Sequence, residues 1–305
     1  MSSMTRVMQK IREDAPTGES ANVPTESFET PAATAPFEEA SGVASGFVEE
    51  PAVAPQPRSV PVTPLEAETR EWDRRQVDPA VIAFHDRYSP ICEKYRAARA
   101  RLLNVNSQHR SQVLAITSSV PQEGKSVSTL NLGLVMAEGG EKRTVIVDAD
   151  LRRPSLARML GAPAQPGLAD VLRGSATLED ALQTTPLPNL RFLPAGNAAD
   201  ASGAELLSSS GAAAALKELR ARFDYVLLDT PPVTTVSDVC LLAPGCDGVI
   251  LVVRMGRSPA PIVVQAVQTL KANKVPVLGC LLSHARDSKT QARYACYYAP
   301  RGRQS

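Results

Sequence analysis

Long hydrophobic runs are missing from this 305-residue sequence. A helix that crosses a bilayer needs about 20 consecutive apolar residues, whereas the longest apolar stretches here, such as 248–253, have the length of a buried strand. Residues 1–12 also lack the apolar core of a signal peptide. We therefore expect a cytoplasmic protein that reaches the inner face of the plasma membrane only through a partner.

Cysteine and net charge are also scarce. The five cysteines form no C-x-x-C pair and no metal-ligand spacing, which favours reduced thiols over a disulfide framework. The formal net charge is +1, so the sequence predicts no nucleic-acid partner. That average hides an asymmetry, because residues 13–57 carry nine acids and no Lys or Arg, whereas residues 286–303 carry five bases and one acid.

Proline marks the first boundary along the chain. Nine of the 25 prolines lie before residue 65, mixed with Ala, Glu, Ser and Thr. A segment of this composition cannot bury enough apolar surface to offset the entropy that ordering costs. We predict a disordered extension over residues 1–77, a single folded domain over residues 78–287, and a flexible tyrosine-containing tail over residues 288–305.

Short runs rich in Val, Ile and Leu alternate with helical patterns in the predicted domain. Near-continuous apolar strands separated by helices are typical of a parallel sheet that is covered on both faces. The predicted fold class is therefore α/β, with a doubly wound, mostly parallel sheet. The predicted strands are 113–117, 144–147, 190–193, 225–228, 248–253 and 276–282, and the predicted helices are 126–138, 155–159, 168–173, 212–222 and 260–272.

A candidate phosphate-binding loop follows the first predicted strand. The segment Ser119-Val-Pro-Gln-Glu-Gly-Lys-Ser126 lies between that strand and a helix, which is the setting such a loop requires. Backbone N–H groups of the loop and the helix N-terminus would surround a polyphosphate. Lys125 would then reach the β- and γ-phosphates, and the Ser126 hydroxyl would bind Mg²⁺. The alternative is an ordinary Gly-Lys-Ser turn at a helix start.

Acidic residues follow two other predicted strands, in Val145-Ile-Val-Asp-Ala-Asp150 and in Tyr225-Val-Leu-Leu-Asp229. Ligands bind at the carboxyl ends of strands in open α/β sheets. Alternation sends Asp148 and Asp150 to the same side if the strand continues, and Asp229 stands where an acid helps to hold Mg²⁺. Each aspartate alone could be only a helix cap, but the three motifs in this order indicate nucleotide binding.

These three motifs, extended by Leu-Arg-Arg-Pro after Asp150 and Thr-Pro-Pro after Asp229, resemble those of the bacterial tyrosine kinases (BY-kinases) of capsule and exopolysaccharide export. The resemblance runs from about residue 78 to residue 283 and includes GLADVLRG from Gly167, LRFLPAG from Leu190 and AELLSS from Ala204. Partitioning and division-site ATPases share the fold, but their loop has an extra lysine at the position of Val120. Gln122 departs from the family pattern, since many members have glycine there.

The resemblance implies a P-loop NTPase fold of the partitioning-ATPase type that binds ATP and Mg²⁺. It implies that Lys125, Asp148, Asp150 and Asp229 are catalytic, and that Ser126, Asp148 and Asp229 hold the metal. The implied nucleotide contacts are Ser119, Val120, Pro121, Gln122, Glu123, Gly124, Lys125, Ser126 and Val127. The implied phosphorylation sites are Tyr294, Tyr297 and Tyr298, although the tail could instead be a segment that packs on the domain or on a partner.

A charged helix also matches the family. Glu93, Arg96 and Arg99 fit its E-x-x-R-x-x-R pattern, and the spacing of three places them on one helix face. The resemblance implies that this face joins subunits into a homo-oligomeric ring. The alternative is a solvated charged face. The resemblance further implies that a separate membrane protein, an adaptor of the chain-length-regulator type, supplies an activating cytoplasmic segment.

The function that the sequence predicts is an ATP-dependent protein-tyrosine autokinase. It would phosphorylate the tail of a neighbouring subunit in trans and thereby regulate polymerisation and export of an exopolysaccharide or capsule. Two alternatives are an ATPase switch that phosphorylates no protein and a nucleotide-dependent scaffold of the export complex. Phosphotyrosine in the tail separates the first function from both of the others.

Overall fold

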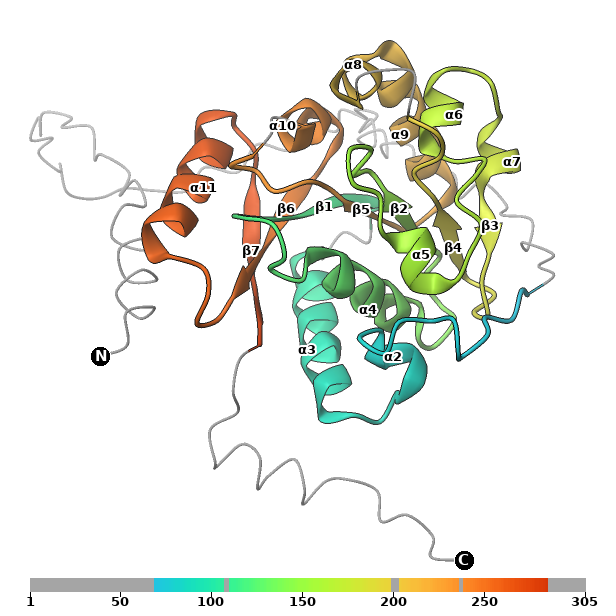
Figure 1. Cartoon of the computed structure of the whole chain (residues 1–305), viewed down its shortest axis with the longest axis horizontal. Coiled ribbons are helices and arrows are strands. Elements are labelled where there is room, and N and C mark those ends of the chain that lie inside the picture. The colour runs from blue at the N-terminus through green and yellow to red at the C-terminus, as the bar shows by residue number, and fades with distance from the viewer. Residues whose placement is uncertain (1–68, 107–109, 199–202, 236–237, 285–305) are drawn as a thin grey trace, which may run out of the picture.

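In the described part of the chain, seven strands form one central sheet (Figure 1). The structure, a computed structural model, describes residues 69–106, 110–198, 203–235 and 238–284. The strand order is β3-β4-β2-β5-β1-β6-β7, and every pairing is parallel except that of β3 with β4. The strands are β1 (Gln112–Ser118), β2 (Thr144–Asp148), β3 (Gln183–Thr184), β4 (Leu190–Leu193), β5 (Tyr225–Asp229), β6 (Gly248–Arg254) and β7 (Val277–Ser283). The predicted mostly parallel sheet is therefore confirmed.

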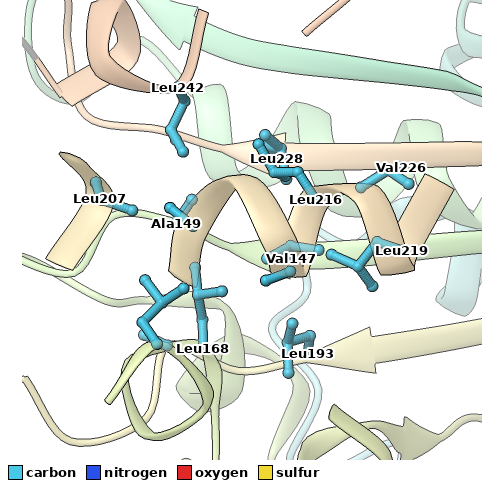
Figure 2. Packing of buried hydrophobic residues seen from close by; sticks show 14 of the residues in the cluster. Val147, Ala149, Leu168, Leu193, Leu207, Leu216, Leu219, Val226, Leu228 and Leu242 are labelled. Atoms are coloured by element: carbon cyan, nitrogen blue, oxygen red, sulfur yellow. The ribbon is translucent and has the colours of Figure 1, made fainter. Parts of the chain in front are cut away.

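Helices cover both faces of this sheet, because successive strand side chains point to opposite sides. On β1, Val113 packs into a cluster with α9 (Ser210–Arg222), whereas Leu114 packs into a cluster with α3 (Pro90–Val105) and α4 (Lys125–Ala137). Figure 2 shows Leu219 of α9 beside Val147 and Val226 of the sheet. The inner strands β1, β2, β4, β5 and β6 are therefore almost entirely buried, as nearly continuous apolar strands require, whereas the edge strand β7 is partly exposed.

The remaining helices are shorter or lie at the sheet margins. They are α2 (Ile82–His85), α5 (Leu156–Leu160), α6 (Leu168–Leu172), α7 (Leu178–Ala181), α8 (Gly203–Ser208), α10 (Asp238–Leu242), the 3₁₀ turn η1 (Ala243–Gly245) and α11 (Ala260–Ala272). None of the helices within the described ranges is long and apolar enough to cross a membrane.

The segment before α2 is packed against the domain, although the sequence placed residues up to 77 in the extension. Trp72 and Val77 are buried in a cluster that includes Leu156 and Leu160 of α5. The Trp72 ring lies 5.6 Å from the ring of Phe84, measured between centroids, and the Asp78 amide donates to the Met159 carbonyl at 2.8 Å. Residues 72–77 therefore contribute to the folded core. Most of the predicted extension and the whole predicted tail, with Tyr294, Tyr297 and Tyr298, lie outside the described residues.

Candidate active site

The loop between β1 and α4 is held by a buried carboxylate. Glu123 has no exposed surface, and its side chain accepts hydrogen bonds from the Ser119 hydroxyl at 2.8 and 2.9 Å and from the Val120 amide at 2.9 Å. Gly124 adopts a left-handed conformation (φ 92°) just before α4 begins, a conformation that glycine adopts without a steric penalty. Ser119, which replaces the first glycine of the generic pattern, thus shapes the loop through Glu123.

Residues distant in sequence also hold the loop. Ser258, after β6, donates to the Glu123 carboxylate, and Ser283, the last residue of β7, donates to the Glu123 carbonyl at 2.6 Å. Arg254 donates to the Gln122 carbonyl at 3.2 Å, and Arg257 donates to Gln122 Oε1 at 3.0 Å. The sequence analysis missed all four residues, because a hydroxyl or arginine more than 130 positions away carries no local signal.

Gln122 adopts a left-handed backbone conformation, with φ 64°. A side chain costs about 1 kcal/mol or more in this conformation, whereas glycine does not incur this cost. We expect Gln122→Gly to be more stable to unfolding than Gln122→Ala by about 1 kcal/mol, although both lose the contact with Arg257. Urea unfolding measures the difference.

The matched control for Gln122 is the exposed Glu141, whose φ is not positive. There the order should reverse, with Glu141→Ala the more stable by up to about 1 kcal/mol, because glycine has more freedom in the unfolded chain. If alanine is the more stable residue at both positions, the left-handed conformation assigned to Gln122 is wrong.

Lys125 is the centre of a compact charged cluster. Its Nζ lies 2.9 Å from Asp150 Oδ2 and 3.4 Å from Asp229 Oδ2. Ser126 Oγ donates to Asp229 Oδ2 at 2.6 Å, and Ser155 Oγ donates to Ser126 Oγ at 3.0 Å. The three sequence motifs thus meet at the carboxyl ends of β1, β2 and β5, where parallel strands of an open sheet bind ligands. Ser155 is a further residue of this cluster that the sequence analysis did not select.

Asp148 lies beside this cluster but faces backbone donors. Its Oδ2 accepts from the amides of Ser155 and Leu156 at 3.0 and 2.9 Å, and its Oδ1 accepts from the Asp150 amide at 3.3 Å. β2 ends at Asp148, so the strand does not continue to Asp150. In this structure Asp148 caps the start of α5, while Asp150 is the aspartate of this motif that contacts Lys125.

Burial controls the ionisation of these groups. Burial and the charge of Asp229 raise the pKa of Asp148 to about 7. Burial also raises the pKa of Asp229, against the opposing effects of Lys125 and Ser126. For Lys125, burial alone would lower the pKa, but the charges of Asp229 and Asp150 outweigh it and raise the pKa above its usual value. The site therefore holds one charged lysine among buried carboxylates. The single positive charge of Lys125 does not balance the negative charge of these groups.

A cavity of about 540 Å³ opens beside the loop. Its lining includes seven of the residues predicted to act there: Pro121, Gln122, Gly124, Lys125, Ser126, Val127 and Asp150. The others, Ser119, Val120, Glu123, Asp148 and Asp229, do not line it. Ser119 and Val120 donate to the buried Glu123 within the loop, and Asp148 and Asp229 are fully buried.

The candidate metal ligands fit a magnesium ion that a nucleotide shares. Ser126 Oγ and Asp229 Oδ2 are hard oxygen donors 2.6 Å apart at the start of α4, and oxygen donors are what Mg²⁺ prefers. Within the described ranges, no three His, Cys, Asp or Glu side chains are arranged to hold a metal alone. Magnesium would then need phosphate oxygens to complete its shell, which is usual for nucleotide sites.

Three arginines lie at the mouth of the cavity. Arg152 pairs with the buried Asp238, with Nε 2.9 Å from Oδ2. Arg153 and Arg158 are exposed and line the cavity. Neither of these two guanidinium groups has a hydrogen-bond or ion-pair partner within the described part of the chain.

The predicted oligomer face on α3 is largely used within the subunit. Arg96 binds the Glu138 carboxylate through two nitrogens at 2.7 Å each and also contacts Glu93 at 2.5 Å. Arg99 donates to the Val135 carbonyl at 2.8 Å. Glu93, with a side chain 67% exposed, is the member of this face that remains open to a neighbouring molecule.

Glu138 therefore links the end of α4 to α3 through its two hydrogen bonds with Arg96. We expect Glu138→Ala to lower the free energy of unfolding by about 1–3 kcal/mol, because bidentate charge-assisted bonds to Arg96 are lost. Glu93→Ala is the matched control and should cost less than about 1 kcal/mol, since its pair is exposed. Urea unfolding of both variants measures this, and equal losses would show that Glu138 does not anchor the helix.

Comparison with known proteins places this site in a family. The AAA domain family matches residues 111–272. The chain is 33% identical over 197 residues to the succinoglycan biosynthesis transport protein ExoP of Rhizobium meliloti, a match that covers 64% of this chain and 25% of ExoP. It is 32% identical over 217 residues to the tyrosine-protein kinase YwqD of Bacillus subtilis, covering 71% of this chain and 90% of YwqD.

A solved structure agrees with these matches. The crystal structure of the chimerical protein CapA2B2 superposes with a TM-score of 0.65 at 28% identity, covering 69% of this chain and 93% of that one. The chain spans about a quarter of the length of ExoP but nearly all of YwqD. The chain therefore belongs to the AAA domain family and, with these relatives, to the bacterial tyrosine kinases (BY-kinases).

Proposed function

We propose that this chain is a Mg·ATP-dependent protein-tyrosine autokinase that phosphorylates Tyr294, Tyr297 and Tyr298. The observation that carries the proposal is the cluster in which Lys125 contacts Asp150 and Asp229 beside Ser126, at the wall of a 540 Å³ cavity. Phosphoryl transfer needs mainly positioning and charge neutralisation, and this cluster supplies both.

ATP binding requires Lys125 to exchange its carboxylate partners for phosphate oxygens. Gly124 and the start of α4 would present backbone N–H groups to the same phosphates. Ser126 and Asp229 would hold Mg²⁺, with Asp148 close behind. The metal would supply positive charge to the phosphates, and the carboxylates with raised pKa values favour a site that receives such a cation.

In the transfer step, the tyrosine oxygen forms a bond to the γ-phosphorus. The bond from that phosphorus to the bridging oxygen breaks, and ADP leaves. The phenolic proton would pass to a carboxylate, for which Asp148, the buried aspartate beside the cluster, is the proposed acceptor. Asp150, bound to Lys125 at 2.9 Å, would position the lysine before ATP arrives.

The end of β7 supports the role of the tail as acceptor. β7 ends at Ser283, whose hydroxyl bonds to the phosphate-binding loop, so the last described strand before the tail ends next to the loop. We propose that the acceptor tyrosine comes from a neighbouring subunit of a homo-oligomeric ring. Glu93 and Ile91 on α3, with Tyr88 just before this helix, offer an exposed surface for that contact, since Tyr88 is 68% and Ile91 50% exposed.

The relatives suggest the biological setting. ExoP is named for succinoglycan biosynthesis and transport. We propose that this chain regulates polymerisation and export of an exopolysaccharide or capsule at the inner face of the plasma membrane. A membrane-embedded adaptor would recruit it and supply an activating cytoplasmic segment.

The test of this proposal measures whether the γ-phosphate of ATP is transferred to protein or released. The full chain is incubated with γ-labelled Mg·ATP, and the label on protein is counted against free phosphate, with Lys125→Met as the blank. We expect label on tyrosine. The Lys125→Met chain is then mixed with a chain that carries Tyr294→Phe, Tyr297→Phe and Tyr298→Phe. If transfer is in trans, the mixture should be labelled on tyrosine. Free phosphate without labelled protein would favour the ATPase switch, and neither product would favour the scaffold.

A further inference from the structure

We propose that the chain's own acidic N-terminal segment, residues 13–57, docks on Arg153 and Arg158 at the mouth of the cavity and competes with ATP. This inference rests on the proposed nucleotide site but not on transfer of phosphate to tyrosine. The segment would act as a tethered regulator of access to the site.

Among the described residues, two positive charges of the receiving surface have no acidic partner. Lys125 and Arg152 line the same cavity, but each of them already has an aspartate partner at 2.9 Å. Arg153 and Arg158 are exposed and have no such partner in the ranges that the structure describes. Two exposed guanidinium groups on one rim favour carboxylates that approach from solution.

Two charged segments of this chain lie outside the described residues, and their opposite charges indicate which of them would bind the two arginines. Residues 13–57 carry nine acids and no base, whereas residues 286–303 carry five bases and one acid. The basic end would be repelled from the arginines, and the acidic segment would be attracted. Because residues 1–68 contain no tyrosine, the acidic segment cannot accept a phosphate on tyrosine, so its docking would occupy the site without supplying a substrate.

The first described residues of the chain also lie close to the helix that carries Arg158. Residues 72–78 lie against α5, which carries Arg158: the Asp78 amide bonds to the Met159 carbonyl at 2.8 Å, and Trp72 packs with Leu156. Figure 1 shows the start of the described chain passing beneath α5. The eleven residues 58–68 span up to about 38 Å when extended, whereas five-residue α5 is only about 7.5 Å long.

Tethering makes a weak contact effective. Exposed arginine–carboxylate pairs are individually weak, but a segment attached by a short linker acts at millimolar effective concentration. We therefore expect occupancy to raise the apparent dissociation constant of ATP about threefold to tenfold at low salt. The effect should shrink toward none at 0.5 M NaCl, because salt screens exposed charges.

The experiment is a double-mutant cycle on the full chain. One change replaces the nine acids of residues 13–57 by their amides, and the other is Arg153→Gln with Arg158→Gln. The affinity for a fluorescent ATP analogue is measured in 50 mM NaCl for all four proteins. In the background with both arginines, we expect replacement of the acids to lower the dissociation constant of the ATP analogue threefold to tenfold. In the Arg153→Gln, Arg158→Gln background, the same replacement should change the dissociation constant less than about 1.5-fold. Arg101→Gln with Arg110→Gln is the control pair and should leave the gain intact.

A second measurement is direct and does not depend on ATP. A labelled peptide of residues 13–57 is titrated with the neutralised full chain, followed by fluorescence anisotropy. We expect salt-sensitive binding that Arg153→Gln with Arg158→Gln weakens at least tenfold. An equal gain in ATP affinity with and without the two arginines would mean that the segment acts elsewhere, for instance on the basic tail. No gain in the wild-type background, or a peptide that ignores the two arginines, would also overturn the proposal.

Discussion

Lys125→Met is expected to weaken ATP binding at least about 100-fold and to destabilise the protein without nucleotide. The lysine is the positive group that the structure places between Asp150 and Asp229, at 2.9 and 3.4 Å. Methionine keeps a similar volume but provides neither a phosphate contact nor a counter-charge. Asp229 has no exposed surface, so an unpaired charge remains in the core.

The loss of stability should be about 3–5 kcal/mol at pH 8, as for buried pairs with one partner removed. It should be smaller at lower pH, because burial raises the pKa of Asp229 and protonation of this carboxyl removes its unpaired charge. Urea unfolding at pH 8 and at lower pH and titration with an ATP analogue provide the measurements. Lys217→Met, at an exposed position of α9, is the control and should change neither quantity appreciably. Full stability of Lys125→Met at pH 8 would show that the lysine does not compensate the aspartates.

The protein without nucleotide or metal is expected to lose stability as the pH rises from 5 to 8. Burial and Asp229 raise the pKa of Asp148 to about 7 in the folded state, whereas an unfolded aspartate titrates near 3.9. Between these values the folded protein keeps a proton that the unfolded chain has released, so rising pH favours unfolding. The loss of stability is complete slightly above pH 7 and amounts to at most about 3 kcal/mol between pH 5 and 8.

Asp148→Asn should flatten this dependence, because asparagine does not titrate. Urea unfolding of both proteins at pH 5, 6, 7 and 8 gives the two slopes. Adding Mg·ATP at pH 8 should restore more stability to the wild type than to Asp148→Asn, if the cation offsets the buried charge. A wild-type stability that rises between pH 5 and 8, or slopes that are equal in both proteins, would contradict the ionisation assigned to Asp148.

The sheet was predictable because its inner strands β1, β2, β4, β5 and β6 are apolar and almost entirely buried. Apolar runs such as 190–193 and 225–228 correspond to β4 (Leu190–Leu193) and β5 (Tyr225–Asp229). Two short helices, α5 and α6, correspond to the predicted 155–159 and 168–173. The short helices α2, α7, α8 and α10 were not predicted, since their stability comes from tertiary contacts. In α2, for example, the Ala83 amide donates to Asn131 Oδ1 of α4 at 2.8 Å, and no local pattern reveals that bond.

The candidate site was predictable only in part, for a related reason. Lys125, Ser126 and Asp229 lie in local motifs, and the parallel sheet brings those motifs together. The groups that shape the loop, Ser258 and Ser283, come from other strand ends. The capping of α5 by Asp148 depends on where β2 ends, which the alternation of side chains did not determine.

Mass spectrometry of residues 288–305 after incubation of the full chain with Mg·ATP tests the central claim most directly. The proposed autokinase should carry phosphate on one or more of Tyr294, Tyr297 and Tyr298, and the Lys125→Met chain should carry none. A tail without phosphate, in a protein shown to bind ATP in the same sample, would contradict the autokinase and leave an ATPase switch or a scaffold.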